Sequence, residues 1–265
     1  MDRDHPLWTP FRDLRAAGRR VVGGREVFIA EGRILVEDLL RAGRAGQLVV
    51  HSVATTPALA EQIKPQLPPS AVLLVAPEDE LHALAGFPFH RGVLACAEVP
   101  DQPPEDALLA CNRLLVLPRL DDAENLGLLL RSAAALGMDG VLLGKGPDLW
   151  SRRTLRVSMG AAWRLPAWRA DDPTDLLTRW RDHDAMMPGE IVGAALGPGS
   201  EVAHSWTPAR RCALMLGPEG AGLDPAWLLR CDRRVVIPMA NAVDSLNVAA
   251  AGAILMFQMT GHREG

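Results

Sequence analysis

The 265-residue sequence lacks the cysteine and histidine spacings that mark metal and redox sites. Its four cysteines form no Cys-x-x-Cys pair, and Cys96, Cys111 and Cys212 lie in or beside apolar runs, unlike Cys231. We therefore expect reduced, mostly buried thiols. The seven histidines are scattered without ligand-like spacing, so we expect no metal ion.

Long apolar segments are also missing. No apolar run reaches the length of a membrane span, and Met1–Pro10 is charged and proline-bearing, unlike the apolar core of a signal peptide. An apolar fraction of 48% and a charged fraction of 23% are ordinary for a soluble globular protein. We expect a cytoplasmic protein without a membrane partner.

Lysine is scarce, because Lys64 and Lys145 are the only two, and the formal net charge is −4. The surface as a whole therefore does not attract nucleic acid. Locally, however, Lys145–Arg169 holds six basic residues against the single acid Asp148. Arginine binds phosphate through planar, bidentate contacts, so this stretch is a candidate RNA track. The alternative is a solvated face in a genome that favours arginine codons.

A polar, proline-rich and acidic segment, Val99–Asp106, separates two regions that both alternate α and β elements. We predict an N-terminal extension over 1–20, a small α/β domain over 21–99, a linker over 100–110 and a larger domain over 111–265. The larger domain has continuous apolar strands, which favour a parallel sheet covered on both faces. The fold class is therefore α/β.

The expected elements follow from apolar runs and their spacing. In the first region we expect helices at Gly32–Ala42, Pro57–Lys64 and Pro77–Leu84, and strands at Gln47–His51, Ala71–Val75 and Gly92–Ala97. In the second we expect strands at 114–117, 141–143, 191–196, 212–216 and 234–237, and helices at 126–136, 174–180, 225–229 and 246–260. The last helix is apolar nearly all round, so its own domain or a second subunit should bury it.

Familiar nucleotide-binding and hydrolase signatures are absent. Gly144-Lys145-Gly146 has the spacing of two Rossmann glycines, but Leu149 occupies the third position, and the flanking residues do not fit a Walker loop. No Gly-x-Ser-x-Gly and no His-Glu-x-x-His sequence occurs. A dinucleotide-dependent oxidoreductase is therefore disfavoured.

Polar residues at one helix start stand out from their apolar surroundings. Asn125 occupies a position suited to a helix N-cap, and Arg131 interrupts a run of Leu and Ala. A charge there needs a partner or a cleft. The structural alternative is that Arg131 reaches solvent or pairs with an acid such as Asp122.

Two later segments each predict a buried strand that ends in an abrupt loop. The first runs from Leu214 through Gly217-Pro218-Glu219-Gly220 to Leu223, and the second runs from Ile237-Pro238-Met239 to Asp244–Val248. Adjacent strand ends with such loops are where a ligand meets main chain, so we expect a small-molecule cofactor site. The plainer alternatives are a solvated turn acid at Glu219 and helix caps at Ser245 and Asn247.

Together, these three segments resemble, in order and spacing, the motifs of the SpoU (TrmH-like) family of SPOUT methyltransferases over about Leu114–Gln258. Ser158–Ala162 is similar to a further family stretch. Phe28–Gly32 and Gly92–Ala95 are similar to the family's RNA substrate-binding domain, which resembles a small ribosomal protein. The resemblance implies an S-adenosylmethionine-dependent RNA 2′-O-ribose methyltransferase that is a homodimer with a deep trefoil knot. The motifs are shared by rRNA and tRNA enzymes, and of these two substrates we favour rRNA.

The resemblance also implies roles for individual residues. Cofactor binding would fall to Leu216, Gly217, Ile237, Met239, Ser245 and Leu246, largely through backbone groups. The catalytic cluster would be Asn125, Arg131, Glu219 and Asn247, and RNA would meet Arg131, Arg152, Arg153 and Arg156. An RNA-binding protein of the same fold without catalysis is the alternative.

Arg131 is an awkward proton acceptor, because its side chain normally stays protonated. We expect it to bind the adjacent phosphate and stabilise the developing alkoxide, with Asn125 and Glu219 orienting it.

Overall fold

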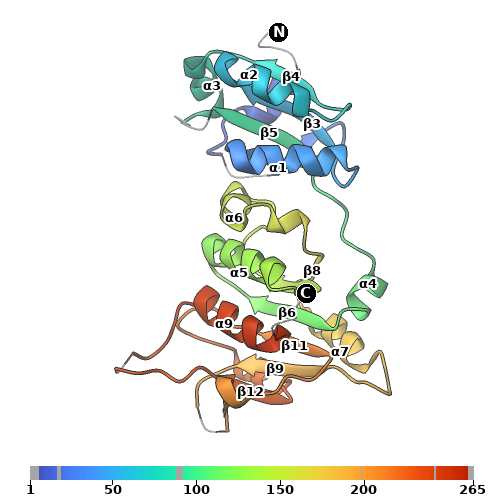
Figure 1. The fold of residues 1–265 in the computed structure, drawn as a ribbon, viewed down its shortest axis with the longest axis vertical. Helices are drawn as coiled ribbons and strands as arrows, with labels where there is room; N and C mark the ends of the chain where they lie inside the picture. The colour runs from blue at the N-terminus through green and yellow to red at the C-terminus, as the bar shows by residue number, and fades with distance from the viewer. Residues whose placement is uncertain (1–5, 17–18, 88–91, 198, 242, 262–265) are drawn as a thin grey trace. The chain divides into compact units, whose positions relative to one another are not determined.

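The computed structural model describes residues 6–16, 19–87, 92–197, 199–241 and 243–261. The chain divides into two compact units. The first comprises residues 1–101 and 150–160, and the second comprises residues 102–149 and 161–265. Helices and strands alternate in both units (Figure 1), which confirms the α/β class.

A mixed five-stranded sheet with the order β1-β2-β5-β3-β4 forms the centre of the first unit. Only β3 and β4 pair in parallel among these described strands. The strands are β1 (Arg20–Val22), β2 (Arg25–Glu31), β3 (Val50–Thr55), β4 (Val72–Val75) and β5 (Val93–Glu98). Val27 and Ile29 of β2 share one core, because alternate residues of a strand face the same side.

Helices cover this sheet. They are α1 (Arg33–Arg44), α2 (Pro57–Ile63), α3 (Glu78–Ala85) and α6 (Arg152–Ser158), with the 3₁₀ turns η1 (Pro6–Phe11) and η2 (Lys64–Gln66). Trp8 and Phe11 of η1 are buried in the same core as Val27 and Ile29. Residues 6–16 are thus part of the unit rather than the extension that the sequence predicted.

The sequence placed the strand before α2 too early, at Gln47–His51, whereas β3 begins at Val50. The reason is that α1 continues to Arg44 and a turn follows it, with Gln47 N donating to Ala42 O. Strands β1 and β2 were not predicted. Strand β1 has only three residues, and the four apolar residues of β2, Val27–Ala30, are flanked by arginine and glutamate.

Among the described residues of the second unit, seven strands form one sheet with the order β10-β12-β9-β11-β6-β7-β8, and each pairing between them is parallel. They are β6 (Arg113–Arg119), β7 (Gly140–Lys145), β8 (Ala167–Arg169), β9 (Glu190–Ala194), β10 (Glu201–Val202), β11 (Cys212–Met215) and β12 (Arg233–Val236). The predicted parallel sheet is confirmed.

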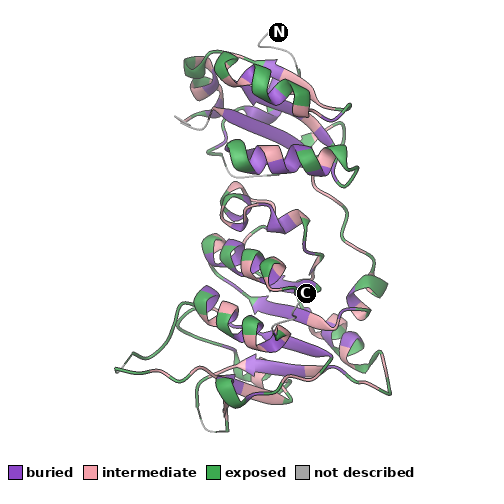
Figure 2. Cartoon of the chain, in the orientation of Figure 1, coloured by how far each residue is buried: buried purple, intermediate pink, exposed green. Residues whose placement is uncertain are grey.

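Helices lie on both faces of this sheet (Figure 1). They are α4 (Glu105–Leu109), α5 (Ala123–Ala135), α7 (Thr174–Asp182), α8 (Pro225–Leu228) and α9 (Val248–Thr260), with 3₁₀ turns η3 (Ala161–Trp163) and η4 (Ala203–Ser205). Leu114 and Val116 share a core with Trp180 of α7. Helices α5 and α9 pack against each other, and Figure 2 shows their buried inner and exposed outer residues.

Two expectations for this region were wrong in detail. The predicted linker 100–110 contains α4, whose Leu108 is fully buried in the second unit's core. The predicted N-cap Asn125 lies inside α5, because the helix starts earlier and Asp122 caps it by accepting from Asn125 N at 3.3 Å. The side chain of Asn125 is therefore available for contacts outside its own helix.

The cysteine prediction is confirmed, because Cys96, Cys111 and Cys212 are buried free thiols and Cys231 is partly buried. Burial raises the pKa of Cys96, Cys111 and Cys212 to about 12 and that of Cys231 to about 11. Removing a thiolate from water disfavours its charge, so these thiols stay protonated.

Candidate functional site

A cavity of about 330 Å³ opens at the carboxyl ends of the neighbouring parallel strands β12, β9 and β11. Each strand contributes the residues with which it ends or that follow it. Loops at the carboxyl ends of parallel strands are the usual ligand site of open α/β sheets. The volume is within the roughly 300–1,000 Å³ typical of small-molecule sites.

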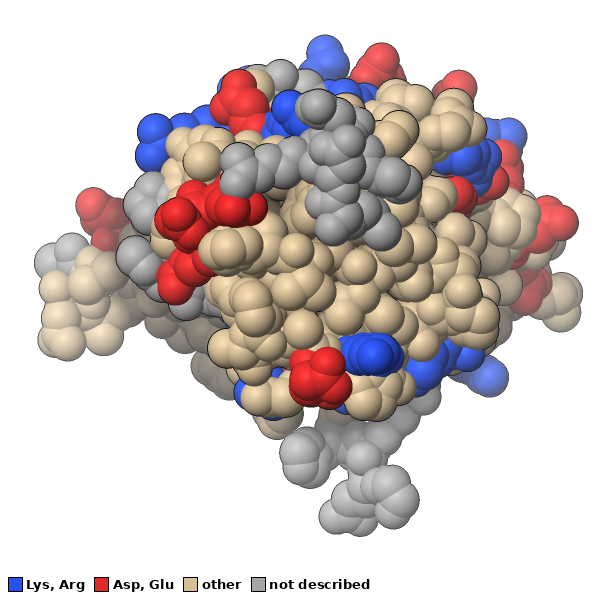
Figure 3. Space-filling model, turned by 90° about the horizontal axis from the view of Figure 1, so that it is seen from above, with Lys and Arg blue, Asp and Glu red and all other residues tan. Residues whose placement is uncertain are grey.

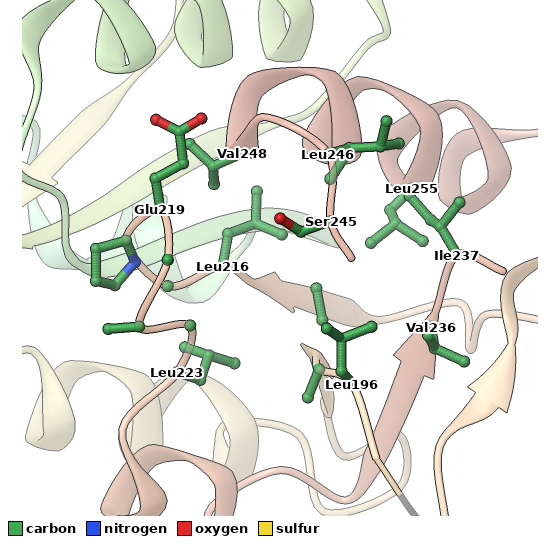
Figure 4. A pocket seen from close by; sticks show the side chains of 18 of the residues that line it. Leu196, Leu216, Glu219, Leu223, Val236, Ile237, Ser245, Leu246, Val248 and Leu255 are labelled. Carbon is green, nitrogen blue, oxygen red and sulfur yellow. The ribbon is translucent and has the colours of Figure 1, made fainter. Parts of the chain in front are cut away.

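All six residues expected to bind a cofactor line this cavity: Leu216, Gly217, Ile237, Met239, Ser245 and Leu246. Figure 4 shows Leu216, Ser245 and Leu246 on one side of the hollow and Leu196 and Leu223 on another. Glu219 and Ser245 are the polar side chains among the described residues that line it. The remaining surface is apolar side chain and main chain.

The loop after β11 folds back on itself at Gly217. A Cβ atom at this position would lie 2.3 Å from the carbonyl carbon of Gly222, closer than any real contact. Gly222 N also donates to Pro218 O at 3.0 Å, which closes the turn. Position 217 therefore requires glycine, because the backbone of Gly222 in the same loop leaves no room for a Cβ atom. The sequence alone did not predict this reason.

Asn247 marks the start of α9. Its Oδ1 accepts from Ala249 N at 2.9 Å and from Ala250 N at 3.3 Å, so it is the helix N-cap. Its Nδ2 points elsewhere, donating to Asn125 Oδ1 at 2.9 Å and to Glu219 Oε1 at 2.7 Å. The amide oxygen of Asn247 thus caps α9, and its amide nitrogen contacts Asn125 and Glu219.

Asn125, Glu219 and Asn247 form a closed hydrogen-bonded ring, which we call the amide–carboxylate ring. Its third side is Asn125 Nδ2 donating to Glu219 Oε2 at 3.1 Å. The ring joins the first turn of α5, the loop after β11 and the start of α9. In Figure 4 the Glu219 carboxylate points away from the hollow that Leu196, Leu216 and Leu223 surround. The ring therefore lies beside the cavity rather than inside it.

Arg131 is not a member of this ring. It is exposed on α5, on a face shared with the exposed Leu128, whereas Asn125 is buried. Within the described part of the chain, no hydrogen bond joins Arg131 to Asn125, Glu219 or Asn247. The expectation that Asn125 and Glu219 orient Arg131 is wrong within a single chain, because six residues of helix turn the two positions to different faces.

The expected RNA-binding arginines of α6 differ from one another. Arg152 is bonded inside the first unit, where Glu31 and the Leu14 carbonyl accept from it, and only 26% of its side chain is exposed. Arg153 and Arg156 are exposed. Farther along the basic stretch, Arg169 donates to the carbonyls of Gly144 and Pro147. Arg152 and Arg169 are thus structural.

Several lining residues were not assigned to cofactor binding from the sequence. They are the end of β9 and its continuation, Ala194–Leu196, together with Leu223, Leu228, Val235, Val236, Val248, Ala251 and Leu255. Apolar residues carry no chemical signature of their own. The strand order would have identified Ala194–Leu196, because β9 lies between β11 and β12.

Two negative findings apply to the described residues alone. Among them, His, Cys, Asp and Glu form no group of three that could hold a metal ion. No helix in the same residues has both the length and the apolar character needed to cross a membrane.

The parallel sheet and the cavity at its carboxyl edge define an α/β protein that can hold a small molecule. The sequence model of the SpoU rRNA methylase family matches residues 112–257. The chain belongs to this family. The match spans α5, the loop after β11 and most of α9, which are the elements that form the amide–carboxylate ring.

Relatives with similar sequences extend over most of the chain. An uncharacterized tRNA/rRNA methyltransferase of Mycobacterium tuberculosis is 36% identical, over 100% of this chain and 92% of the relative. The 23S rRNA (guanosine(2553)-2′-O)-methyltransferase of Bacillus subtilis is 29% identical over 88% of each chain. An AdoMet-bound rRNA methyltransferase from Sinorhizobium meliloti has a similar structure, with a TM-score of 0.78, 26% identity and coverage of 100% of this chain and 98% of that one.

Proposed function

We propose that this protein transfers a methyl group from S-adenosylmethionine to a ribose 2′-hydroxyl of RNA, in rRNA rather than tRNA. The observation that carries the proposal is the amide–carboxylate ring beside a small-molecule cavity at the carboxyl edge of the sheet. The rRNA substrate and the 2′-oxygen named for the Bacillus subtilis relative, and the AdoMet bound to the Sinorhizobium meliloti protein, support it.

The cavity fits such a cofactor in size and in lining. Leu196, Leu223 and Leu246 offer apolar surface for a base and ribose, and the glycine-rich turn 217–222 exposes backbone groups for hydrogen bonding. S-adenosylmethionine supplies an activated methyl group together with its own leaving group. The chain's task is then to bind and orient, and holding two reactants in near-attack geometry accounts for much of the rate.

The amide–carboxylate ring has the role of positioning. It fixes the start of α9 against α5 and against the loop after β11, and residues of that loop and of α9 line the cavity. Glu219 is exposed and accepts two amide N–H groups, so its carboxylate stays on the outer side of the cavity wall. An RNA ribose that approaches from that side meets the exposed Glu219 before it meets the cofactor.

A homodimer is part of the proposal. The outer faces of α5 and α9 expose the apolar residues Leu128, Ile254 and Phe257, of which Phe257 is 52% exposed. Packed helices with an exposed apolar face favour burial by a second copy. Arg131 lies on the same face of α5 as Leu128, so a dimer would bring it to the interface, where its cation can bind an RNA phosphate and stabilise the developing alkoxide.

The trefoil knot is also a proposal. Residues 237–247 lead from β12 to α9, and α9 packs on α5 and near β11 rather than beside β12. The chain must therefore return past the loop after β11, where Gly217 and Gly222 approach each other. Threading at this place would explain why both segments line one cavity.

RNA contacts are assigned to Arg131, Arg153 and Arg156. Because phosphate contacts release counterions, RNA affinity should fall steeply with salt, and salt-insensitive binding would contradict this assignment. Unpaired bases in an rRNA loop are the favoured target class. Activity on ribosomal RNA would place the protein in the cytoplasm, with no metal ion required.

The deciding experiment is methyl transfer from labelled S-adenosylmethionine to total RNA of a strain that lacks the gene, followed by mapping of the modified ribose. We expect a single 2′-O-methyl site in rRNA. The alternative, an RNA-binding protein without catalysis, predicts RNA binding without incorporation of label. Titration calorimetry with S-adenosylmethionine separates the two, because the catalytic protein must bind the cofactor.

A further inference from the structure

Residues 150–160 are part of the first unit although they lie within the span that the methylase family model matches. The chain leaves the first unit after Asp101, re-enters it at Trp150 and leaves again after Gly160. A segment of the methylase region is thereby built into the unit that the sequence assigns to RNA recognition. The contacts that hold it there are specific.

Arg152 is the main anchor of this segment. Its Nη2 donates to Glu31 Oε2 at 2.9 Å, and its Nη1 donates to the Leu14 carbonyl at 2.9 Å. The guanidinium lies over the Phe87 ring, 4.5 Å from its centroid. Arginine can make these contacts together because its planar fork both bonds and stacks, whereas lysine cannot.

Glu31 makes the anchor strong as well as specific. Its side chain is only 8% exposed at the end of β2, and a carboxylate at such a place needs a cation. Removing one partner of a buried pair leaves the other charge uncompensated. Trp150 adds to the anchor by stacking on Phe28, with ring centroids 5.0 Å apart.

The outer side of the docked segment is basic. Between Trp150 and Gly160 there is no acidic residue, and Arg153 and Arg156 are exposed. Figure 3, seen from the end where α2 and α3 lie in Figure 1, shows acidic and basic side chains around a largely uncharged centre. That face offers no continuous basic area among the described residues.

We propose that Glu31 and Arg152 are positioning residues for RNA: they hold α6 on the first unit so that Arg156 contacts an RNA phosphate as part of that unit. This inference rests on the proposed function, since it assumes an RNA substrate. Arg152, which the sequence suggested as an RNA contact, is therefore a residue of the interior. Glu31 gains a role that no sequence motif indicates.

The first test compares Glu31→Gln with Glu37→Gln. Glu37 pairs with Arg33 in the same unit at 2.8 Å, but in an exposed place, so its variant is a matched control. We expect Glu31→Gln to raise the KM for RNA roughly five- to tenfold through the loss of a phosphate contact. The kcat and the Kd for S-adenosylmethionine should stay unchanged. Glu37→Gln should leave all three values unchanged.

Trypsin measures the docking directly, because its cleavage sites Arg153 and Arg156 lie on α6. Cleavage in the folded protein requires local opening. Glu31→Gln and Arg152→Lys should both speed cleavage at α6. Arg152→Lys keeps the charge and provides a second variant if Glu31→Gln unfolds, which loss of cofactor binding would reveal.

A double variant decides whether docking acts through Arg156. Arg156→Gln alone should raise the KM for RNA, but it should add little in the Glu31→Gln background, because undocked α6 no longer presents Arg156. Fully additive effects, or faster cleavage with an unchanged KM, would overturn the inference. If the wild type binds no S-adenosylmethionine and methylates no RNA, the proposed function fails instead, and the two results are distinct.

Discussion

Asn247 shows how one side chain can serve two structural tasks. Its amide oxygen caps α9, and its amide nitrogen donates to Asn125 and Glu219. An aspartate would keep the oxygen and lose the donor. The two tasks can therefore be separated by substitution.

We expect Asn247→Asp to keep the helix cap and to lose most methyl transfer, because aspartate caps helices as well as asparagine, whereas its carboxylate cannot donate to Glu219 and repels it. Asn247→Ala should lose both the helix cap and methyl transfer. The missing cap should reduce the free energy of unfolding by about 1 kcal/mol. Urea denaturation and single-turnover methylation measure the two effects. An active Asn247→Asp enzyme would show that the amide–carboxylate ring is dispensable.

Arg131 can be tested by a conservative change. If it binds a phosphate through its planar fork, Arg131→Lys should lower kcat at saturating RNA by at least about tenfold, because lysine offers a point charge instead of a bidentate contact. The fold should not change, since the side chain is exposed. Near-wild-type turnover at saturating RNA would contradict a requirement for guanidinium.

At the scale of elements, the outer faces of α5 and α9 carry the dimer proposal. Phe257→Asp should shift the protein toward monomer in analytical ultracentrifugation, because it places a charge in an apolar contact. Leu229→Asp is the control, since Leu229 is 82% exposed at the end of α8, outside this face. A Phe257→Asp protein that remains dimeric would place the interface elsewhere.

The sequence predicted buried elements better than exposed ones. The apolar runs behind β6, β7, β9, β11 and β12 were identified because a parallel sheet covered on both faces needs continuous apolar residues. The short edge strands β8 and β10 were missed, since they consist of three and two residues with little apolar pattern. Strand β6 also continues through Pro118 to Arg119, where pairing with β7 resumes at Lys145.

The candidate site was predicted in part, for a similar reason. Ordered motifs with polar residues indicated Asn125, Glu219 and Asn247, and the structure brings these three together. Contacts made by arginine were not predictable. Arg152 and Arg131 look alike in sequence, but one lies beside a buried carboxylate and the other on an exposed helix face. Only tertiary structure separates those environments.

At the scale of the whole molecule, alkaline stability should depend on thiols to an unusual degree. The sequence has no tyrosine and only two lysines, so few other groups titrate above pH 9.0. Folding raises the pKa of Cys96, Cys111 and Cys212 from 9.0 to about 12. The unfolded chain releases these protons first, so the thiols favour the folded state below pH 9 and this contribution is lost as pH rises toward 12.

We therefore expect the urea midpoint to be steady up to about pH 9 and to fall above it. The free energy of unfolding should fall with a limiting slope of about 1.4 kcal/mol per pH unit for each such thiol. Cys111→Ala should make the fall shallower by one thiol's share, measured against wild type at each pH. A midpoint that stays constant between about pH 9 and pH 11 would mean that these thiols are not desolvated as the structure places them.

The apolar lining of the cavity has a consequence for turnover. The methyl donor carries a positive sulfur, whereas the demethylated product is neutral at that atom, and the one carboxylate in the wall, Glu219, points outward. Moving a cation into a place without a facing anion is unfavourable, so the hollow should retain spent product at least as tightly as fresh donor. Release of the demethylated product, rather than binding of S-adenosylmethionine, would then limit the rate of turnover. Removal of the free product in the cell would control that rate.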